Sequence, residues 1–243
     1  MVIAEQLVDS LRHAGRVLVV TGAGISAESG VPTFRDAQTG YWADFKPEEL
    51  ATPEAFERNP KLVWDWYAER REMVARVEPN PGHYALARIE QQVGEFLLAT
   101  QNVDGLHHRA GSASVVELHG NISRVKCSAE GTMVENWGEG SPPPCESCGA
   151  NLRPDVVWFG EMLPESALQR ATKATEVCDV FFSIGTSAMV WPAAGLGQSA
   201  AENGAVVVEI NPETTPLTRG ADHVLHGPAG EVLPMLVKAV WGE

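Results

Sequence analysis

The sequence predicts an α/β fold, a Rossmann-like doubly wound parallel sheet joined to a smaller domain that contains a helical insert and a cysteine-containing insert. Three observations lead to this prediction. Residues 17–20 are apolar and β-branched and run into a glycine-rich turn, which is typical of a buried central strand. Strand-like and helical patterns then alternate along most of the chain. Residues 121–151 interrupt the alternation with a segment rich in glycine, proline and cysteine, so they are expected to lie outside the sheet.

The elements are expected in the following order. An amphipathic helix over 2–14 precedes the first strand, and two short helices with proline at their first position fall within 37–58. A longer helix over 60–77 comes next. Further helices are expected at 83–92, 105–110, 165–177, 192–203 and 229–240. Further strands are expected at 95–99, 115–118, 155–159, 179–184, 205–210 and 222–225. The larger domain then comprises 1–32, 81–120 and 152–243, and the smaller one 33–80 and 121–151.

The charge balance is acidic. The chain of 243 residues carries 18 Lys and Arg side chains against 32 Asp and Glu, a formal charge of −14. Nucleic-acid binding needs a basic face, so this balance argues against a nucleic-acid partner and suits lysine-rich peptide segments. The N-terminal segment does not resemble a secretory signal, and no apolar run is long enough for a membrane span. Four cysteines, two of them in a C-x-x-C pair, suit a reducing compartment. We therefore expect a cytoplasmic protein without a membrane partner, and the oligomeric state stays open.

The turn after the first strand has the pattern of a dinucleotide-binding loop. Gly22, Gly24 and Ala27 match G-x-G-x-x-G/A at a point where a strand should pass into a helix. In such a loop the first glycine allows a tight turn and the second lets the backbone approach a pyrophosphate, while the helix N-terminus offers N–H donors. A ribose-binding carboxylate should end a second strand about twenty residues later. The chain instead enters the polar segment 32–36, so a dinucleotide is expected to bind in a variant manner.

Polar residues follow several of the expected strands. They are the glycine turn, 101–104, His119, 185–187 and Asn211. Ligands collect at the carboxyl ends of parallel strands, so these groups are expected to open on one crevice. His119 is the natural general base among them, because an imidazole with a pKa near ~6.5 transfers protons at neutral pH. Each group has a structural alternative: Asn102 and Asp104 could cap the next helix, and His119 could be a satisfied strand-end histidine.

Seven motifs together resemble the sirtuin (Sir2) family of NAD-dependent protein-lysine deacylases, in the family's order and over nearly the whole chain. They lie at 22–26, 32–36, 100–104, 117–120, 156–160, 185–187 and Asn211. Tyr67 and Arg70 further resemble the class III, CobB-like branch. The resemblance implies that NAD and acyl-lysine proteins or peptides bind to the chain. It implies the following NAD-binding residues: Gly22, Ala23, Gly24, Ser26, Glu28, Phe34, Arg35, Gln101, Asn102, Asp104, Gly185, Thr186, Ser187, Asn211 and Ala229.

The resemblance also implies a mechanism. Asn102 and Asp104 would hold the nicotinamide end of NAD in a strained pose, and the acyl oxygen would attack the ribose and expel nicotinamide. His119 would then deprotonate a ribose hydroxyl, so that the acyl group passes to ADP-ribose. The residues expected to pair with the substrate backbone and enclose the lysine stem are Val156, Val157 and Phe159. Two alternatives stay open: an ADP-ribosyltransferase or NAD hydrolase that uses the same site, and a module that senses NAD without turnover.

Arg70 interrupts the apolar stripe of its expected helix, with Tyr67 three residues away on the same face. From spacing alone, Arg70 would be a snorkelling arginine paired with a nearby carboxylate. The resemblance implies instead that its guanidinium binds the terminal carboxylate of succinyl, malonyl or glutaryl lysine, to which Tyr67 adds a hydroxyl. Desuccinylation and demalonylation are therefore expected beside deacetylation.

The cysteines depart from the sirtuin pattern, in which two C-x-x-C pairs usually hold a structural zinc. Cys145 and Cys148 form one pair, but Cys127 stands alone, with Glu130 where its partner would be. Three thiolates do not close a tetrahedral site. We therefore expect a degenerate zinc ribbon without metal, and keep as the alternative a zinc site in which Glu130 supplies an oxygen ligand.

Overall fold

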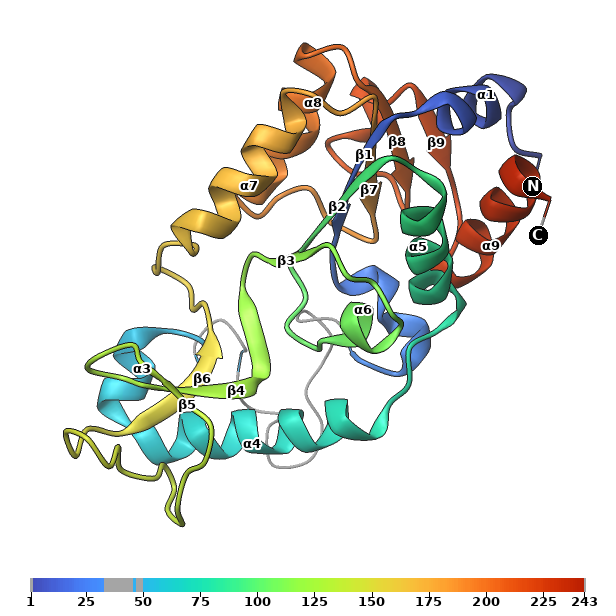
Figure 1. Ribbon diagram of the computed structural model, residues 1–243. Coiled ribbons are helices and arrows are strands. Elements are labelled where there is room, and N and C mark those ends of the chain that lie inside the picture. The colour runs from blue at the N-terminus through green and yellow to red at the C-terminus, as the bar shows by residue number, and fades with distance from the viewer. Residues whose placement is uncertain (1, 33–45, 47–49, 243) are drawn as a thin grey trace.

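The computed structural model describes residues 2–32, 46 and 50–242. Its largest feature is a six-stranded parallel sheet in the order β3-β2-β1-β7-β8-β9 (Figure 1). Its strands are β1 (Arg16–Thr21), β2 (Glu95–Thr100), β3 (Val115–Glu117), β7 (Val180–Ile184), β8 (Val206–Ile210) and β9 (His223–Leu225). The chain builds outward from β1 on one side and then returns to build from β7 on the other. The strand order therefore reverses between β1 and β7, where doubly wound sheets bind ligands.

Helices cover both faces of this sheet. One face carries α1 (Glu5–His13), α5 (Pro81–Gln92) and α9 (Ala229–Trp241), and the other carries α7 (Glu165–Thr175) and α8 (Leu196–Glu202). The central strand β1 shows why, since Val17 and Val19 enter the first core while Leu18 and Val20 enter the second. Successive side chains of a strand point to opposite faces, so a strand that is apolar at every position needs cover on both.

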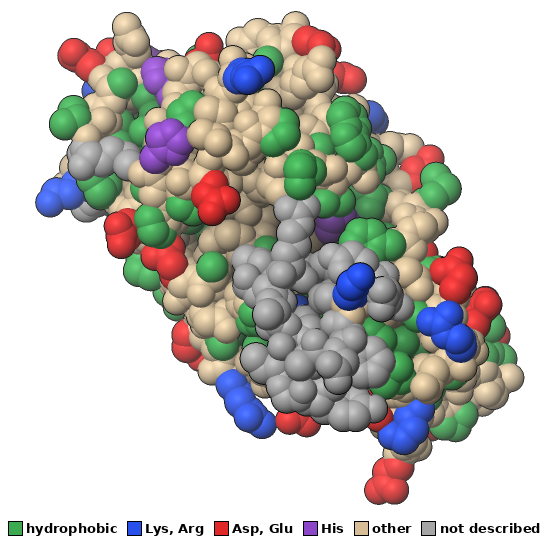
Figure 2. All heavy atoms as spheres, turned by 180° about the vertical axis from the view of Figure 1, so that it is seen from behind, with side chains coloured by type: hydrophobic (Ala, Val, Ile, Leu, Met, Phe, Trp, Pro, Cys, Tyr) green, Lys and Arg blue, Asp and Glu red, His purple; other side chains and the backbone are tan. Residues whose placement is uncertain are grey.

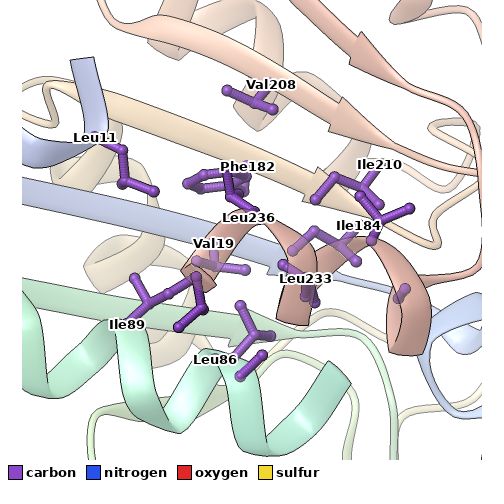
Figure 3. Packing of buried hydrophobic residues seen from close by; sticks show 14 of the residues in the cluster. Leu11, Val19, Leu86, Ile89, Phe182, Ile184, Val208, Ile210, Leu233 and Leu236 are labelled. Atoms are coloured by element: carbon purple, nitrogen blue, oxygen red, sulfur yellow. The ribbon is translucent and has the colours of Figure 1, made fainter. Parts of the chain in front are cut away.

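The core beneath α5 and α9 fixes the two strands that border the reversal point. Val19 of β1 and Phe182 of β7 lie in it with Leu86 of α5 and Leu236 of α9 (Figure 3). Each of these four side chains is fully buried. The loops that leave β1 and β7 therefore start from a rigid base.

A second, antiparallel sheet and two helices form the other end of the molecule (Figure 1). The sheet has the order β5-β4-β6, with β4 (Gly120–Cys127), β5 (Met133–Val134) and β6 (Leu152–Val156). The helices are α3 (Pro53–Arg58) and α4 (Pro60–Arg76). Asn59 caps α4 by accepting a hydrogen bond from the Leu62 N–H at 3.2 Å. Trp66 of α4 and Trp158, which follows β6, are buried in the core that joins these helices to the sheet.

The prediction of a main-sheet strand at 155–159 was wrong. Residues 152–156 form β6, which pairs with β4 in the antiparallel sheet, with Gly120 opposite Val156. The sequence assigned these residues to the larger domain, whereas the structure places them in the sheet of the smaller one. A short apolar run predicts a strand without saying which strand it pairs with.

The glycine turn differs from prediction as well. It leads into two three-residue 3₁₀ turns, Ala23–Ile25 and Ala27–Ser29, rather than into an α-helix. Of the two short helices expected within 37–58, α3 is present, and the other falls largely outside the described residues. The other predicted helices and strands are confirmed, with ends that differ by a few residues.

Charged side chains are mixed on the molecular surface. On the face drawn in Figure 2, Lys and Arg lie interspersed with Asp, Glu and hydrophobic side chains. None of the helices in the described part of the chain combines the length and apolar character of a membrane-crossing segment.

Candidate active site

The loops after β1 and β7 touch each other at the reversal point of the sheet. The Gly22 N–H donates to the Ile184 carbonyl at 3.0 Å, and the Gly24 N–H donates to the Gly185 carbonyl at 2.9 Å. A Cβ on Gly22 would lie 2.8 Å from the Gly185 oxygen, and one on Gly24 would lie 2.7 Å from the Gly185 Cα. Gly185 has φ +59°, and a Cβ there would lie 2.5 Å from the Ile25 nitrogen. The glycines are therefore required for contact between the two loops, a reason that the dinucleotide motif does not contain.

Ser26, Asn102 and Asp104 form a buried hydrogen-bonded cluster beside the first loop. The Ser26 hydroxyl donates to the Asp104 carboxylate at 2.7 Å, and the Asn102 amide donates to the Ser26 oxygen and the Gly22 carbonyl, both at 3.1 Å. Asp104 also accepts from the Leu106 N–H at 2.9 Å, at the start of α6 (Leu106–Arg109). Burial raises the pKa of the Asp104 carboxyl, and its hydrogen bonds oppose the rise. Asp104 thus combines the capping role with a place in this buried cluster.

A threonine pair and His107 support Asn102 from within the sheet. The Thr21 hydroxyl donates to the Thr100 hydroxyl at 2.8 Å, and the Thr100 oxygen accepts from the Asn102 N–H at 3.0 Å. His107 Nε2 lies 2.9 Å from the Thr21 oxygen, so it donates there and the ring carries its proton on Nε2. Burial lowers the pKa of His107, which keeps its imidazole neutral.

His83 lies on the other side of the same cluster. Its Nε2 is 3.4 Å from the Ser26 hydroxyl, its Nδ1 accepts from the Asn80 N–H at 3.2 Å, and its ring centroid is 4.9 Å from that of His107. Burial lowers the pKa of His83 to about 4. Both histidines are site residues that the sequence reasoning missed, since neither follows a strand directly. The only available signal was the N-P-G-H sequence at the start of α5, which reads as a helix cap.

His119 follows β3 at the carboxyl edge of the sheet and is partly exposed. Its Nδ1 lies 2.9 Å from the Gln101 carbonyl oxygen. A carbonyl can only accept, so the proton sits on Nδ1 and the lone pair of the neutral ring sits on Nε2. Burial lowers the pKa of the imidazole, and the hydrogen bond to Gln101 opposes this. The ring is therefore neutral at pH 7 and oriented to accept a proton through Nε2.

The backbone joins His119 to the segment expected to bind substrate. The Val157 N–H donates to the His119 carbonyl at 2.9 Å, next to the Gly120 and Val156 pair. Gly120 has φ +78°, and a Cβ there would lie 2.1 Å from the Asp155 carbonyl oxygen. Only glycine permits this approach, so the residue after His119 fixes where 156–159 begins.

The three residues assigned to substrate binding differ in exposure. Phe159 is 46% exposed and the nearby Met162 93% exposed. Val157 is half-buried, whereas Val156 points into the core around Trp158. Val157 and Phe159 therefore keep part of their surface exposed to solvent, and the side chain of Val156 is directed away from it.

Tyr67 and Arg70 lie one turn apart on α4. The buried Tyr67 oxygen accepts a hydrogen bond from Trp158 Nε1 at 3.0 Å, and its hydroxyl can also donate. The Arg70 guanidinium lies 4.9 Å from the centroid of the Trp66 ring. Burial lowers the pKa of Arg70, and no carboxylate among the described residues forms an ion pair with it. The acidic partner expected from spacing alone is therefore not found there.

A salt bridge holds the tryptophan that binds Tyr67. The Arg153 guanidinium lies 3.3 Å from the centroid of the Trp158 ring, and its Nη1 is 2.6 Å from a Glu161 oxygen. The other Glu161 oxygen accepts from the Trp158 N–H at 2.8 Å. Arg153, Glu161 and Trp158 were not assigned roles from the sequence, because an ion pair eight residues apart along an irregular segment has no periodic signature.

The remaining predicted cofactor residues have mixed positions. Asn211 donates from its amide to the Thr186 carbonyl at 2.7 Å, which ties the end of β8 to the loop after β7. The Glu28 carboxylate accepts from the Gly230 N–H at 2.6 Å at the start of α9. Both side chains therefore have structural roles. Ala23, Gln101 and Ser187 are half-buried, and Ala229 is buried. Phe34 and Arg35 lie outside the described residues.

Comparison with known proteins decides the family. The sequence model of a protein family described as "Sir2 family" matches residues 22–192 of this chain. The chain belongs to the Sir2 family. A Ralstonia nicotianae protein named "NAD-dependent protein deacylase" is 54% identical over 93% of this chain and 93% of its own length. A solved structure described as a Sir2 homolog–NAD complex has a TM-score of 0.92 at 46% identity, with 98% of this chain and 94% of that chain covered. Another, described as Sir2 bound to acetylated peptide, has a TM-score of 0.87 at 28% identity and 98% coverage of both chains.

These comparisons confirm the family resemblance and the predicted fold class. Among the residues that the structure describes, one cluster that could hold a metal ion lies beside the second sheet. The ligand atoms of Cys127, Glu130, Cys145 and Cys148 all lie within 4.8 Å of one another. The four cysteines of the chain are free thiols, and Cys178 is buried elsewhere in the core. Glu130 therefore joins three thiols at a single point.

Proposed function

We propose that this Sir2-family chain is an NAD-dependent protein-lysine deacylase that removes succinyl and malonyl groups in preference to acetyl. The observation that carries the proposal is the geometry of His119. Its Nδ1 is held by the Gln101 carbonyl, which leaves Nε2 as a proton acceptor. Asn102, which follows Gln101 in sequence, lies in the buried cluster with Ser26 and Asp104. A base and a set of polar anchors thus share one edge of the sheet.

The residues at this edge fit NAD. The loops after β1 and β7 meet at the reversal point of the sheet, the usual place of a dinucleotide. The relative from Ralstonia nicotianae carries NAD in its name, and the superposed Sir2 homolog was solved with it. When bound, NAD supplies the ribose that accepts the acyl group and the nicotinamide that leaves. Gly22, Ala23, Ser26 and the loop 185–187 would hold it, with Asn102 and Asp104 at the reactive end.

His119 performs the proton transfer in this proposal. The neutral imidazole accepts a proton at Nε2 from a ribose hydroxyl, and Nδ1 keeps its own proton on the Gln101 carbonyl. As positive charge develops on the ring, the carbonyl dipole stabilises it. A general base in this position contributes about 10²- to 10⁴-fold to a rate.

The preference for acidic acyl groups follows from Tyr67 and Arg70. Arg70 offers a charged guanidinium with no carboxylate partner among the described residues, and the Tyr67 oxygen accepts from Trp158, so that its O–H would be a donor to the substrate. A terminal carboxylate satisfies both donors, whereas an acetyl group satisfies neither. The carboxylate would then replace the water that solvates Arg70 when no substrate is bound.

The peptide itself would bind along 157–159, where an extended chain can pair with the backbone beside His119. The acidic protein favours acyl-lysine peptides with basic neighbours, and the superposed Sir2 structure with an acetylated peptide supports a peptide ligand. We also propose a cytoplasmic location, since all four cysteines are free thiols.

A panel of acyl-peptides tests this proposal. One peptide sequence carrying acetyl, malonyl, succinyl or glutaryl lysine is incubated with NAD, and the free lysine peptide, nicotinamide and acyl-ADP-ribose are measured by mass. Deacylation predicts the three products in equal amounts, with the acidic acyls faster. Nicotinamide release without free lysine would identify an NAD hydrolase or ADP-ribosyltransferase instead. NAD binding without nicotinamide release would identify a sensor.

A further inference from the structure

We propose that Glu209, a carboxylate buried near the end of β8, is a positioning residue that fixes the loop 211–218 under the adenosine half of NAD. The inference rests on the proposed function, in which this chain uses NAD, and adds to it a residue that does not touch the cofactor. The side chain of Glu209 is 1% exposed, and no cation among the described residues forms an ion pair with it. A buried charge of this kind needs a compensating set of hydrogen bonds.

Glu209 points away from the core beneath α5 and α9. Its neighbours in β8, Val208 and Ile210, lie in that core (Figure 3). Successive side chains of a strand point to opposite faces, so Glu209 lies on the face covered by α7 and α8, as Val207 does. Because the strand is otherwise apolar on this face, the partners of Glu209 must come from outside the strand.

Two threonine hydroxyls of the loop after β8 supply the hydrogen bonds. The Thr215 hydroxyl donates to Glu209 Oε1, and the Thr218 hydroxyl donates to Glu209 Oε2. The Thr215 oxygen also accepts from the Leu217 N–H at 3.1 Å, and the Thr218 oxygen accepts from the Thr215 N–H at 2.8 Å. One carboxylate therefore fixes two side chains and, through them, two backbone groups of the loop.

The start of the same loop is fixed by Asn211, which is expected to bind NAD. The Asn211 amide donates to the Thr186 carbonyl at 2.7 Å, and its side-chain oxygen accepts from the Glu213 N–H at 3.3 Å. Leu217 packs against the core beneath α7 and α8. The exposed residues 212–214 thus lie between two attachments, Asn211 on one side and the threonines bound to Glu209 on the other.

The strand order places this loop opposite to the nicotinamide end. In the proposed function nicotinamide lies near Asn102 and Asp104, which follow β2 on one side of the reversal point. β8 is three strands away in the order β2-β1-β7-β8, about 14 Å at the usual strand spacing. A dinucleotide that crosses the reversal point therefore brings its adenosine half to the loop after β8.

Loss of the Glu209 contacts should weaken cofactor binding and leave the chemical step unchanged. A loop that is no longer fixed must be ordered when NAD binds, and this ordering reduces affinity. The ground state and the transition state lose the same binding energy, because the reacting atoms lie over other strands. Such a uniform loss raises KM for NAD without lowering kcat.

Thr215→Val and Thr218→Val test this in the full chain, because each removes one hydroxyl and keeps nearly the same shape. Each should raise KM for NAD, and Kd for ADP-ribose measured by calorimetry, about tenfold, as expected when a hydrogen bond to a charged group no longer orders the loop. Both kcat at saturating NAD and KM for the acyl-peptide should change by less than about threefold. Thr215→Ser and Thr218→Ser keep the hydroxyl and should restore the wild-type values.

Two further variants separate positioning from general stability. Glu209→Gln should raise KM for NAD as well, and its combination with Thr218→Val should add less than the sum of the two, because both variants remove the same interaction. Thr175→Val is the matched control. Thr175 is a buried threonine of α7 whose hydroxyl donates to the Thr172 carbonyl at 2.7 Å, so its loss should lower the melting temperature and leave KM for NAD unchanged.

Two results would overturn the proposal. Unchanged KM for NAD and unchanged ADP-ribose affinity in folded Thr215→Val and Thr218→Val would show that Glu209 stabilises the fold without positioning the cofactor loop. A loss of kcat as large as the rise in KM, or the same rise in Thr175→Val, would assign the effect to general loosening of the fold. Failure of the wild type to bind NAD and ADP-ribose would instead refute the proposed use of NAD itself, and this inference with it.

Discussion

Replacement of Arg70 by methionine should separate the activities on acidic and neutral acyl groups. Arg70 is partly buried over the Trp66 ring, and burial already lowers the pKa of its guanidinium, so the charge is incompletely solvated without substrate. The carboxylate of a succinyl-lysine that replaces the water around Arg70 gains hydrogen bonds to a charged donor, worth about 1.5–3 kcal/mol. This corresponds to roughly a ten- to 150-fold loss of kcat/KM for succinyl-lysine in the variant. Methionine fills similar space over Trp66, so the apolar packing is kept.

The assay is a comparison of kcat/KM on succinyl- and acetyl-lysine versions of the same peptide. Deacetylation should change by less than about threefold, because acetyl has no carboxylate. Arg76→Met is the matched control on the same helix, since Arg76 is exposed and, within the described ranges, pairs with Glu72 at 3.3 Å. It should leave both activities unchanged. Equal losses of desuccinylation and deacetylation in Arg70→Met would refute the role of Arg70 in acyl recognition.

Three further outcomes follow from the site. Burial lowers the pKa of His119, so the neutral base persists below pH 6.5. The value of kcat/KM should therefore stay level from about pH 6.5 to 8 and fall only under more acidic conditions. A kcat/KM profile that rises through pH 7 would contradict this. Gly185→Ala should destabilise the fold by more than Gly204→Ala. Both glycines have positive φ, but of the two only a Cβ at 185 meets backbone, 2.5 Å from the Ile25 nitrogen. We expect a strain of about 1–3 kcal/mol at both positions and an additional loss of unfolding free energy from the clash at 185, both measured by urea unfolding. Burial lowers the pKa of His83 from 6.5 to about 4, so the contribution of His83 to stability is complete above pH 6.5 and is lost as the pH falls toward 4. Between these pH values the folded His83→Gln variant should lose about 3 kcal/mol less unfolding free energy than the wild type. Equal pH dependence of the two proteins would show that His83 does not titrate with unfolding.

The sheet could be predicted because its signals are local. Val17–Val20 are apolar on both faces, and such a strand has few places other than the centre of a covered parallel sheet. The strand-end rule brought Asn102, Asp104 and His119 to one edge without knowledge of their contacts. For these elements the local pattern and the tertiary fold agree.

Features that depend on pairing could not be read in the same way. Residues 155–159 have a strand pattern, but their partner is β4, and Gly120 sets that pairing from a distant point in the chain. His83 and His107 enter the site through ring contacts across 24 residues of sequence, and Glu161 reaches it through Arg153. These residues reach the site through tertiary contacts, and such contacts leave no periodic pattern in the sequence.

A single-turnover measurement on wild type and His119→Ala tests the central claim most directly, namely that His119 and the nucleotide-binding loops serve one reaction. Enzyme in excess is mixed with succinyl-peptide and NAD, and nicotinamide and free lysine peptide are followed by mass. The wild type should form both at the same rate, and the variant should form free lysine about 10²- to 10⁴-fold more slowly. Free lysine formed at the wild-type rate by a folded His119→Ala variant would contradict the assignment of the imidazole as the base.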